Sequence, residues 1–480
     1  MTNESPQNSR FDANASLDLT VLAGGFCVGC GACASLPNGT YRMEYTEDHN
    51  YRAARSQPGR DTHAAQVCPF SSEATNETEI AAALYPNCHT DERLGKYLGT
   101  YAGHAKLGGI RERGSSGGLT TWVAQQLLSR KLVDAVAHVH GPLPADQTES
   151  RVLYKYGLSW NEDQLTTNAK TRYYPIEMSE VIREIRATPS IRVAFVGVPC
   201  FVKAVRLLCR HDEDLNQKIA YCISLVCGHL KSSRWADLAA WQCGVPPAEL
   251  KSIDFRKKIP GRPANSYGVE INSPQDHESA GRVRPVSELF GNSWAYMLFA
   301  YKACDYCDDI LGETADLSVG DAWLPPHNLD YRGTNVVVTR HPQIEAILQD
   351  GVASGAIELE KVNIDQVAHT QRGNLRHRHE GLAFRLYEAQ LLGQWTPPKR
   401  IQPSQDHLTN ERREVFRLRT AMRERSHIAF REAVRQNNLK YFIRQMKPLT
   451  YAHDKLTIGG VAIRAVRKAI RILKKAVGYG

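Results

Sequence analysis

Cysteine spacing constrains this chain more than any other feature of its sequence. Three of its 12 cysteines stand two residues apart in the run Cys27-Val-Gly-Cys30-Gly-Ala-Cys33, and Cys68-Pro69 follows downstream. Three thiolates at this spacing can bind three corners of an iron–sulfur cube, and a more distant Cys followed by Pro is typical of the fourth ligand. A structural zinc site remains the alternative, although it usually takes two separated C-x2-C pairs. The run therefore predicts a 4Fe–4S cluster.

Composition places the chain among ordinary globular proteins, with 42% hydrophobic and 23% charged residues. This excludes a mainly disordered or fibrous protein. The first twenty residues contain no apolar stretch of the kind found in secretory signals. The longest nearly apolar run, residues 193–202, is far shorter than the ~20 residues that a membrane span needs. We therefore expect a cytoplasmic protein, in which closely spaced cysteines bind metal rather than form disulfides.

Charge is concentrated at the C-terminal end. The net charge is +9, but the excess lies beyond residue 400, so the body gives no electrostatic reason to bind nucleic acid. Residues 459–477 alternate Val, Ile and Leu with Arg and Lys at near-helical spacing. A basic amphipathic helix of this kind can lie on an anionic membrane surface. Peripheral contact with the inner face of the membrane and a helix packed on the body both remain open.

Changes in periodicity divide the chain into four parts. Residues 1–20 form a polar, mobile lead, and residues 21–99 a ferredoxin-like iron–sulfur segment. Strands alternate with helices over residues 100–362, and a helical, basic extension occupies residues 363–480. Such alternation favours an α/β sheet with parallel strand pairs, and the pattern after residue 250 is more mixed. The predicted fold class is therefore mixed α/β (α+β).

The individual elements follow from the same patterns. Helices are expected over 118–130, 178–187, 201–209, 232–241, 294–301, 410–446 and 459–477. Strands are expected over 132–139, 192–198, 219–226, 253–255, 267–271, 316–319 and 335–339.

Four further cysteines stand where a second metal site is possible. Cys200 and Cys227 each follow an expected strand, and Cys304-Asp-Tyr-Cys307 is another C-x2-C pair. Parallel strands end at one edge of a sheet, where ligands normally bind, so Cys200 and Cys227 can face one site. A single Cys after a strand is more often a small buried hydrophobic residue, and that interpretation remains open. The other four cysteines are assigned a structural role: Cys88, Cys209, Cys222 and Cys243.

A loop rich in glycine and serine opens the first expected helix of the central region. It reads Gly114-Ser115-Ser116-Gly117-Gly118. Glycines permit close approach of the backbone, hydroxyls donate hydrogen bonds, and a helix N-terminus favours an anion such as a flavin phosphate. A plain turn with a helix cap is the alternative.

Charged and titratable residues follow three of the expected strands. Asp321 ends the strand of the segment Asp-Leu-Ser-Val-Gly-Asp, Lys258 follows the strand at 253–255, and His229 stands two residues after Cys227. At such positions these side chains can contact a ligand at the sheet edge. Ordinary surface charge is the alternative.

Taken in order, these motifs resemble the beta-subunit family of coenzyme F420 hydrogenase/dehydrogenase. The family's relatives include the 7-hydroxymethyl chlorophyll a reductase type and homologues in bacterial polysaccharide gene sets. The resemblance covers roughly residues 20–340, and the tail after about residue 400 has no matching part. The matching segments are CVGCGAC at 27–33, CP at 68–69, GSSGG at 114–118, GVPC at 197–200, VCGH at 226–229, FRKK at 255–258, CDYC at 304–307 and ADLSVGDAW at 315–323.

The resemblance implies an oxidoreductase that depends on FAD and on one or two 4Fe–4S clusters. Electrons from a ferredoxin-like donor would pass through the clusters to FAD and on to a conjugated small-molecule substrate, with polysaccharide biosynthesis as one setting. By this resemblance the loop at 114–118 helps to hold FAD, and Asp321, Lys258 and His229 are catalytic candidates that contact flavin or substrate. The second cluster would take as ligands Cys200, Cys227, Cys304 and Cys307.

Two other functions remain open. One is an electron-transfer subunit that reduces only a partner protein. The other is a zinc-stabilised scaffold protein that binds through its basic tail.

Overall fold

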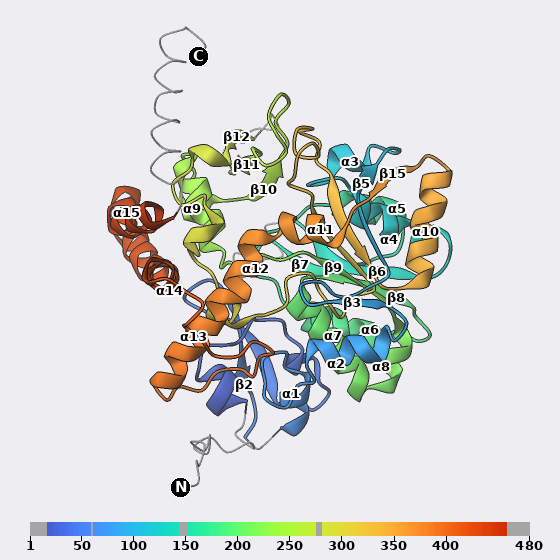
Figure 1. The fold of residues 1–480 in the computed structure, drawn as a ribbon, viewed down its shortest axis with the longest axis horizontal. Helices are drawn as coiled ribbons and strands as arrows, with labels where there is room; N and C mark the ends of the chain where they lie inside the picture. The colour runs from blue at the N-terminus through green and yellow to red at the C-terminus, as the bar shows by residue number, and fades with distance from the viewer. Residues whose placement is uncertain (1–16, 59–60, 144–151, 275–280, 458–480) are drawn as a thin grey trace.

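An eight-stranded mixed sheet forms the centre of the protein (Figure 1). The structure is a computed structural model that describes residues 17–58, 61–143, 152–274 and 281–457. The strand order is β15-β5-β14-β13-β9-β8-β6-β7. The three central pairs β13–β9, β9–β8 and β8–β6 are parallel, and the others are antiparallel. The strands are β5 (Gly99–Ala105), β6 (Ala135–His140), β7 (Lys155–Ser159), β8 (Val193–Gly197), β9 (Ile219–Leu225), β13 (Leu317–Asp321), β14 (Asn335–Thr339) and β15 (Ile357–Lys361).

Helices cover both faces of this sheet, which explains its apolar central strands. Every residue of β8 is buried, as expected for a parallel strand with no face toward water. Val193 and Phe195 pack into one hydrophobic cluster, and Ala194 and Val196 pack into another on the opposite face. The first cluster contains α6 (Ser179–Ala187), α7 (Pro199–His211) and α8 (Glu213–Lys218), and the second contains α4 (Leu119–Ser129), α5 (Glu162–Thr167) and α10 (Pro342–Ala353). The predicted α/β class is confirmed.

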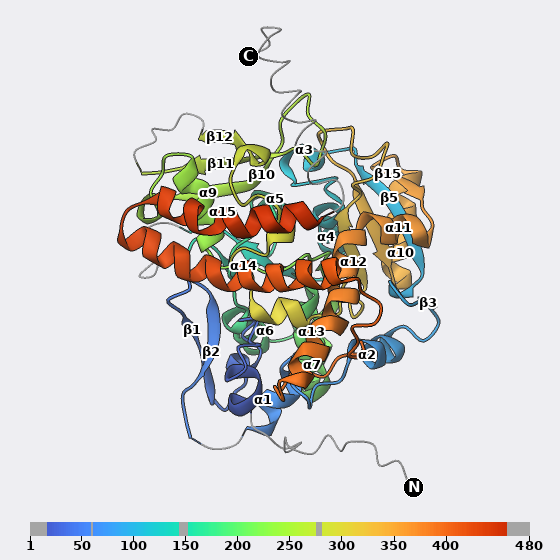
Figure 2. The ribbon, with the colours of Figure 1, turned by 60° about the vertical axis from the view of Figure 1, so that its left-hand side comes forward.

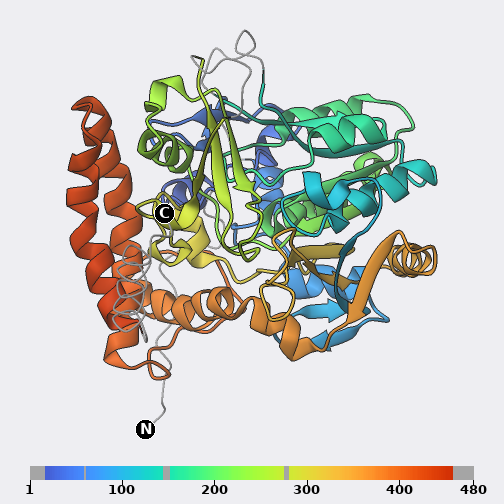
Figure 3. The same ribbon diagram turned by 90° about the horizontal axis from the view of Figure 1, so that it is seen from above.

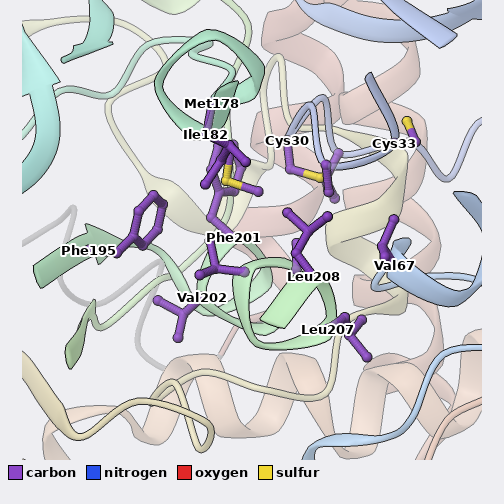
Figure 4. Close-up of a cluster of buried hydrophobic side chains, with 14 of the residues drawn as sticks. Cys30, Cys33, Val67, Met178, Ile182, Phe195, Phe201, Val202, Leu207 and Leu208 are labelled. Carbon is purple, nitrogen blue, oxygen red and sulfur yellow. The ribbon is translucent and has the colours of Figure 1, made fainter. Parts of the chain in front are cut away.

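The N-terminal segment packs against the face that α6 and α7 cover. Its residues Val28 and Val67 belong to the same hydrophobic cluster as Ile182 of α6 and Leu208 of α7 (Figure 4). The segment therefore shares its core with the sheet, and a boundary at residue 99 stays a prediction. It contains the hairpin β1 (Tyr41–Tyr45) and β2 (Tyr51–Arg55), helices α1 (Thr62–Val67) and α2 (Glu77–Leu84), and the hairpin β3 (His89–Asp91) and β4 (Gly95–Tyr97).

A small antiparallel sheet and a pair of long helices form a second layer. The sheet contains β10 (Ser252–Lys257), β11 (Gly268–Asn272) and β12 (Arg282–Pro285). Helices α14 (Asn410–Arg435) and α15 (Leu439–Leu456) lie side by side (Figures 2 and 3). Their buried side chains share a hydrophobic cluster with the small sheet and with α9 (Arg234–Gln242).

Three short helices connect the main sheet to this pair. They are α11 (Ile364–Thr370), α12 (Arg372–Arg378) and α13 (Glu380–Leu391), and in Figure 1 they run from the sheet toward the N-terminal segment. The expected helical character of the chain beyond residue 363 is thus confirmed. The predicted basic helix over 459–477 lies outside the described residues. Among the helices that the structure describes, none combines the length and apolarity needed to cross a bilayer.

Two expected helices are wrong, and both fail at residues with left-handed backbone. The single helix over 410–446 is two helices, because the chain turns at Gln436–Asn438 and Asn437 has a φ of 47°. The helix over 294–301 is only a 3-10 turn, Trp294–Tyr296, because Met297 and Phe299 have φ values of 57° and 59°. A non-glycine residue in this region ends a helix, since it cannot continue the right-handed turn.

Candidate functional site

Four cysteines of the N-terminal segment line one small cavity, which we call the first cysteine site. Its members are Cys27, Cys30, Cys33 and Cys68. Cys33 begins a 3-10 turn and Cys68 follows the last residue of α1, so two local elements hold all four thiols together. In Figure 4, Cys30 and Cys33 are drawn among the side chains of the hydrophobic cluster to which they belong.

Glycine spacers make the tight path between these cysteines possible. Gly29 and Gly31 have φ values of 68° and 86°, a region that side chains with a Cβ rarely adopt. A Cβ on Gly29 would also lie 2.5 Å from the carbonyl oxygen of Tyr51. The N–H groups of Gly29 and Ala53 each donate to Cys27 Sγ at 3.4 Å. The loop thus directs backbone donors at sulfur, as an iron–sulfur site requires.

A second set of four cysteines lines a separate cavity, the second cysteine site. Its members are Cys200, Cys227, Cys304 and Cys307. Cys200 lies in the first turn of α7 after β8, and Cys227 lies just beyond β9, the parallel neighbour of β8. Cys304 lies in the 3-10 helix Lys302–Tyr306, and Cys307 follows that helix. The structure therefore brings together four residues from three distant segments.

Burial dominates the acid–base behaviour of both sets of thiols. It raises the pKa of Cys68 and of Cys227 to about 12 and that of Cys304 to about 11. Neighbouring thiols raise the pKa of Cys33 and of Cys200 further, because like charges disfavour ionisation. All twelve cysteines are free. Four thiols that converge on one cavity can ionise together only when a metal supplies positive charge.

The two cysteine sites adjoin each other. Val28, which stands between Cys27 and Gly29, lines both cavities. Cys30 of the first site also lies close enough to raise the pKa of Cys200 in the second, after the larger effects of burial and of Cys307, Cys227 and Cys304. The two cavities thus share Val28 as a lining residue.

Unpartnered polar atoms gather beside the second cysteine site. Among the described residues, His229 Nε2 and Arg378 Nε are buried and lack a hydrogen-bond partner. Arg378 and Asp309 line the cavity themselves. Buried polar atoms without partners are rare in folded proteins, and they indicate a missing group, ion or water. This observation fits a polar or charged ligand in the second cavity.

The glycine–serine loop at 114–118 begins α4, but its groups already have partners within the chain. Ser116 Oγ donates to the carbonyl of Thr334 at 3.2 Å, and Ser115 Oγ accepts from the N–H of Thr171 at 2.9 Å. A Cβ on Gly117 would lie 2.7 Å from Asn335 Oδ1, which accepts from the first N–H of α4. The loop is therefore packed tightly against β14, and Ser115 keeps a hydroxyl hydrogen to donate.

Lys258 holds this loop in place. Its ammonium donates to the carbonyls of Arg111 and of Ser116, the latter at 3.0 Å. Burial, followed by the charges of Lys170 and Arg111, lowers the pKa of Lys258 to about 7. No carboxylate of the described residues forms an ion pair with it. Arg111 and Lys170 form ion pairs with Asp330 and Asp254, so an anion bound at the loop would compensate the charge of Lys258 alone.

Asp321 and His229 lie at opposite ends of one chain of contacts. Both carboxylate oxygens of Asp321 accept from Arg256 at 3.0 Å, and Arg256 also donates to the hydroxyl of Tyr173 at 3.2 Å. The ring centroids of Tyr173 and Trp294 are 4.7 Å apart, and those of Trp294 and His229 are 4.6 Å apart. The sheet edge that carries Asp321 is thus connected through packed rings to the second cysteine site.

The other four cysteines lie outside the two cavities. Cys88 Sγ donates to the carbonyl of Arg340 at 3.2 Å, Cys209 is buried on α7, and Cys222 is buried within β9. Cys243 stands at the end of α9. Their surroundings agree with a structural role.

The residues other than cysteine that line the second cavity are not evident from the sequence as site residues. They include Val28, Asp309 and Arg378. The only sequence signal for Arg378 is its place in the run Arg376-His-Arg378-His, which is typical of a solvated basic surface.

Two family models match the chain. The model for the coenzyme F420 hydrogenase/dehydrogenase beta subunit N-terminus matches residues 100–183, and the model for the C-terminus of the same subunit matches residues 191–365. No curated protein matches the chain. Among solved structures, the chain is similar to a chain of the F420-reducing NiFe hydrogenase complex from Methanosarcina barkeri, described as a xenon derivative. The two share 16% identity with a TM-score of 0.49, over 65% of this chain and 99% of that chain.

The two family matches together span more than half of the chain, and the C-terminal match contains all four residues of the second cysteine site. The family consists of iron–sulfur oxidoreductase subunits that transfer electrons. The chain therefore belongs to the coenzyme F420 hydrogenase/dehydrogenase beta-subunit family.

Proposed function

We propose that this oxidoreductase holds a 4Fe–4S cluster in each cysteine site and FAD at the glycine–serine loop. The observation that carries the proposal is the pair of cavities that meet at Val28, each lined by four free cysteines. Two adjoining clusters form a path for single electrons through the protein, which is how such centres usually operate.

The arrangement of the thiols supports a cluster rather than zinc. Four sulfurs around one tetrahedral zinc ion lie within about 4 Å of each other, because each zinc–sulfur bond is about 2.3 Å long. Within the described parts of the chain, no three His, Cys, Asp or Glu side chains are placed to hold a single metal ion. Thiols that surround a cavity more widely than one ion requires are consistent with the larger iron–sulfur cube.

The charge around the glycine–serine loop supports an anionic cofactor. Lys258 carries a partly buried ammonium beside Arg111 and Lys170, and its only hydrogen-bond partners among the described residues are carbonyls. The pyrophosphate of FAD would supply the compensating negative charge, with donors from the N-terminus of α4 and the hydroxyl of Ser115. Lys258 and the residues at 114–118 are therefore the residues we assign to FAD binding.

When bound, the clusters would pass single electrons and FAD would exchange them in pairs with a substrate. The chain itself fixes the spacing and excludes water. Val28 fills the space between the cysteine sites, and the rings of Tyr173, Trp294 and His229 fill the space toward Asp321. Lys258 can hold or release a proton at Nζ near neutral pH, because its pKa is about 7.

For the substrate and partners we propose a ferredoxin-like electron donor and a conjugated small-molecule acceptor, with polysaccharide biosynthesis as one setting. An electron-transfer subunit that reduces only a protein partner is the second candidate, and membership of a family of beta subunits favours it. Activity of the isolated chain with a deazaflavin acceptor would support the first candidate. Activity that appears only with a protein partner would support the second.

Anaerobic purification tests the proposal directly. We expect about eight iron atoms and eight acid-labile sulfides per chain, one FAD, and the broad visible absorbance of 4Fe–4S centres. A colourless protein that contains zinc and lacks sulfide would overturn both clusters. A brown protein without flavin would overturn the assignment of Lys258 and residues 114–118 alone.

A further inference from the structure

A buried arginine from the C-terminal extension faces the second cysteine site. Arg378 ends α12, beyond residue 365 where the family match stops, and its side chain is 1% exposed. It lines the cavity together with Cys200, Cys227, Cys304 and Cys307. The guanidinium thus belongs to a site whose ligands all come from the family-matched part of the chain.

Although Asp309 lines the same cavity, Arg378 forms no ion pair with a carboxylate of the described residues. It donates to the carbonyl of Cys307 at 3.3 Å and to the carbonyl of Gly228, and its Nε has no partner in the described part of the chain. By contrast, the buried Arg206 forms an ion pair with Asp316 at 2.7 Å, and the buried Arg256 forms one with Asp321 at 3.0 Å. Because a buried charge without a counter-ion is unfavourable, a negative group in the cavity that Arg378 lines would stabilise it.

The lining of the cavity identifies that negative group, because the four cysteines that line it together with Arg378 are the ligands that we assign to the second cluster. A 4Fe–4S cluster with four thiolate ligands carries net negative charge, which increases by one when the cluster is reduced. A fixed cation beside a cluster in a site without water stabilises the reduced cluster, because the reduced cluster carries the more negative charge.

The neighbouring residues of the extension keep Arg378 in this position. Asp305 lies between Cys304 and Cys307, is 1% exposed, and accepts from Arg423 Nε of α14 at 2.8 Å. Arg385 of α13 donates to the carbonyl of Asp305 at 2.8 Å and to the carbonyl of His377 at 2.8 Å. The extension is therefore anchored to the Cys304–Cys307 segment on both sides of Arg378.

We propose that Arg378 is a positioning residue for the second cluster, a fixed counter-cation by which the C-terminal extension raises the reduction potential of that cluster. The inference rests on the proposed second cluster. It predicts that the cation acts more strongly on the second site than on the adjoining first site, because the first cavity is not lined by Arg378.

The test is an anaerobic redox titration followed by electron paramagnetic resonance, with iron content measured in parallel. Four proteins are compared: wild type, Arg378→Gln, Arg378→Lys and Arg376→Gln. Arg376 lies on the same helix but is exposed, so its variant makes the same charge change away from the cavity. A Cys30→Ser protein identifies the signal of the second cluster, since it removes a ligand of the first.

We expect Arg378→Gln to lower the equilibrium constant for reduction of the second cluster about tenfold or more, which is about 59 mV for one electron. Arg378→Lys keeps the charge, so its equilibrium constant for reduction of the second cluster should stay within about threefold of wild type. For Arg376→Gln the same constant should stay within about twofold. Loss of second-cluster iron in Arg378→Gln, with retention in Arg378→Lys, would also support the inference.

An unchanged potential in iron-loaded Arg378→Gln would overturn the role of Arg378. So would equal iron loss from both sites in the Gln and Lys variants, because that result indicates a structural role only. Wild-type protein with iron for only one cluster would instead overturn the proposed function, so the two failures are distinguishable.

Discussion

The two cysteine sites use the same ligand chemistry but are built in different ways. The first takes all four cysteines from one N-terminal stretch, where glycines with positive φ turn the chain back on itself. The second depends on the main sheet, since Cys200 and Cys227 come together only because β8 and β9 are parallel neighbours. A local site can form with its segment, whereas the second requires the whole fold.

The sites also differ in the charges around them. Near the first site, Lys203 forms a buried ion pair with Glu77 at 3.0 Å, and Arg52 is exposed to solvent. Near the second site, Arg378 is buried and forms no ion pair among the described residues. A charge that is screened or paired has little effect on a neighbouring centre, whereas a buried unpaired charge has a large one. The second cluster should therefore be the easier one to reduce, which directs electrons from the first site to the second.

Removal of one ligand from each site tests whether the two are independent, and it has the largest expected effect. Cys30→Ser should lose the first cluster and keep the second, so iron falls from about eight to about four atoms per chain. Cys227→Ser should lose the second cluster and destabilise the fold as well, since its site is central. Iron analysis and thermal unfolding under nitrogen measure both effects. Loss of all iron in Cys30→Ser would show that the first site is required to build the second.

Asp305→Asn tests how firmly the extension is attached to the second site. Arg423 keeps the pKa of Asp305 well below its usual range despite burial, so the carboxylate is charged. Loss of the buried partner leaves Arg423 paired only with the exposed Glu424 and should reduce the free energy of unfolding by about 3–5 kcal/mol.

The matched control is Asp18→Asn beside the first site. Asp18 pairs with Arg55, and both side chains are about one-quarter exposed to solvent. Loss of this ion pair should reduce the free energy of unfolding by only about 1 kcal/mol. Urea unfolding at pH 7 measures the difference, and equal costs for the two variants would contradict the central role of Asp305.

The first site could be predicted from sequence because its ligands are local. The run at 27–33 with Cys68 is a spacing signal, and the structure adds only the turns at Gly29 and Gly31. The second site could be predicted in part, because apolar strands before Cys200 and Cys227 placed both at one sheet edge. The position of Cys304–Cys307 depends on packing of a segment that has no regular strand or long helix.

Other features could not be predicted because nothing local encodes them. The expected helix over 294–301 fails at Met297 and Phe299, whose left-handed backbone is imposed by the surrounding core rather than by their residue type. Arg378 has the local pattern of a surface arginine, and only contacts with Cys307 and Gly228, far away in sequence, show that it is buried. Tertiary packing overrides local preference at both places.

Lys258 should give the glycine–serine loop a pH dependence that neither cysteine site shares. Its folded pKa is about 7, below the value of about 10.4 in an unfolded chain. Between these values the unfolded chain binds more protons, so the contribution of Lys258 to stability without FAD should rise from pH 7 to pH 10. Lys258→Met should remove that rise, which is on the order of 2 kcal/mol.

FAD provides the control for this effect. A bound pyrophosphate would keep the Lys258 ammonium protonated, so the FAD-loaded protein should show a much smaller rise in stability over the same pH range. Thermal unfolding of the cofactor-free and FAD-loaded proteins at several pH values measures the difference. The same slope in both proteins would separate Lys258 from flavin binding.

Substitution of a cysteine outside both sites has the smallest expected effect. Cys243 stands at the end of α9, is partly exposed and lines neither cavity. Cys243→Ala should therefore leave iron content and both cluster potentials unchanged and should alter the free energy of unfolding by less than about 1 kcal/mol, since little buried volume is lost. The buried Cys222 offers a matched comparison, because Cys222→Ala opens space inside β9 and should cost more stability while iron stays constant. Loss of iron in either variant would mean that the ligand sets extend beyond the eight assigned cysteines.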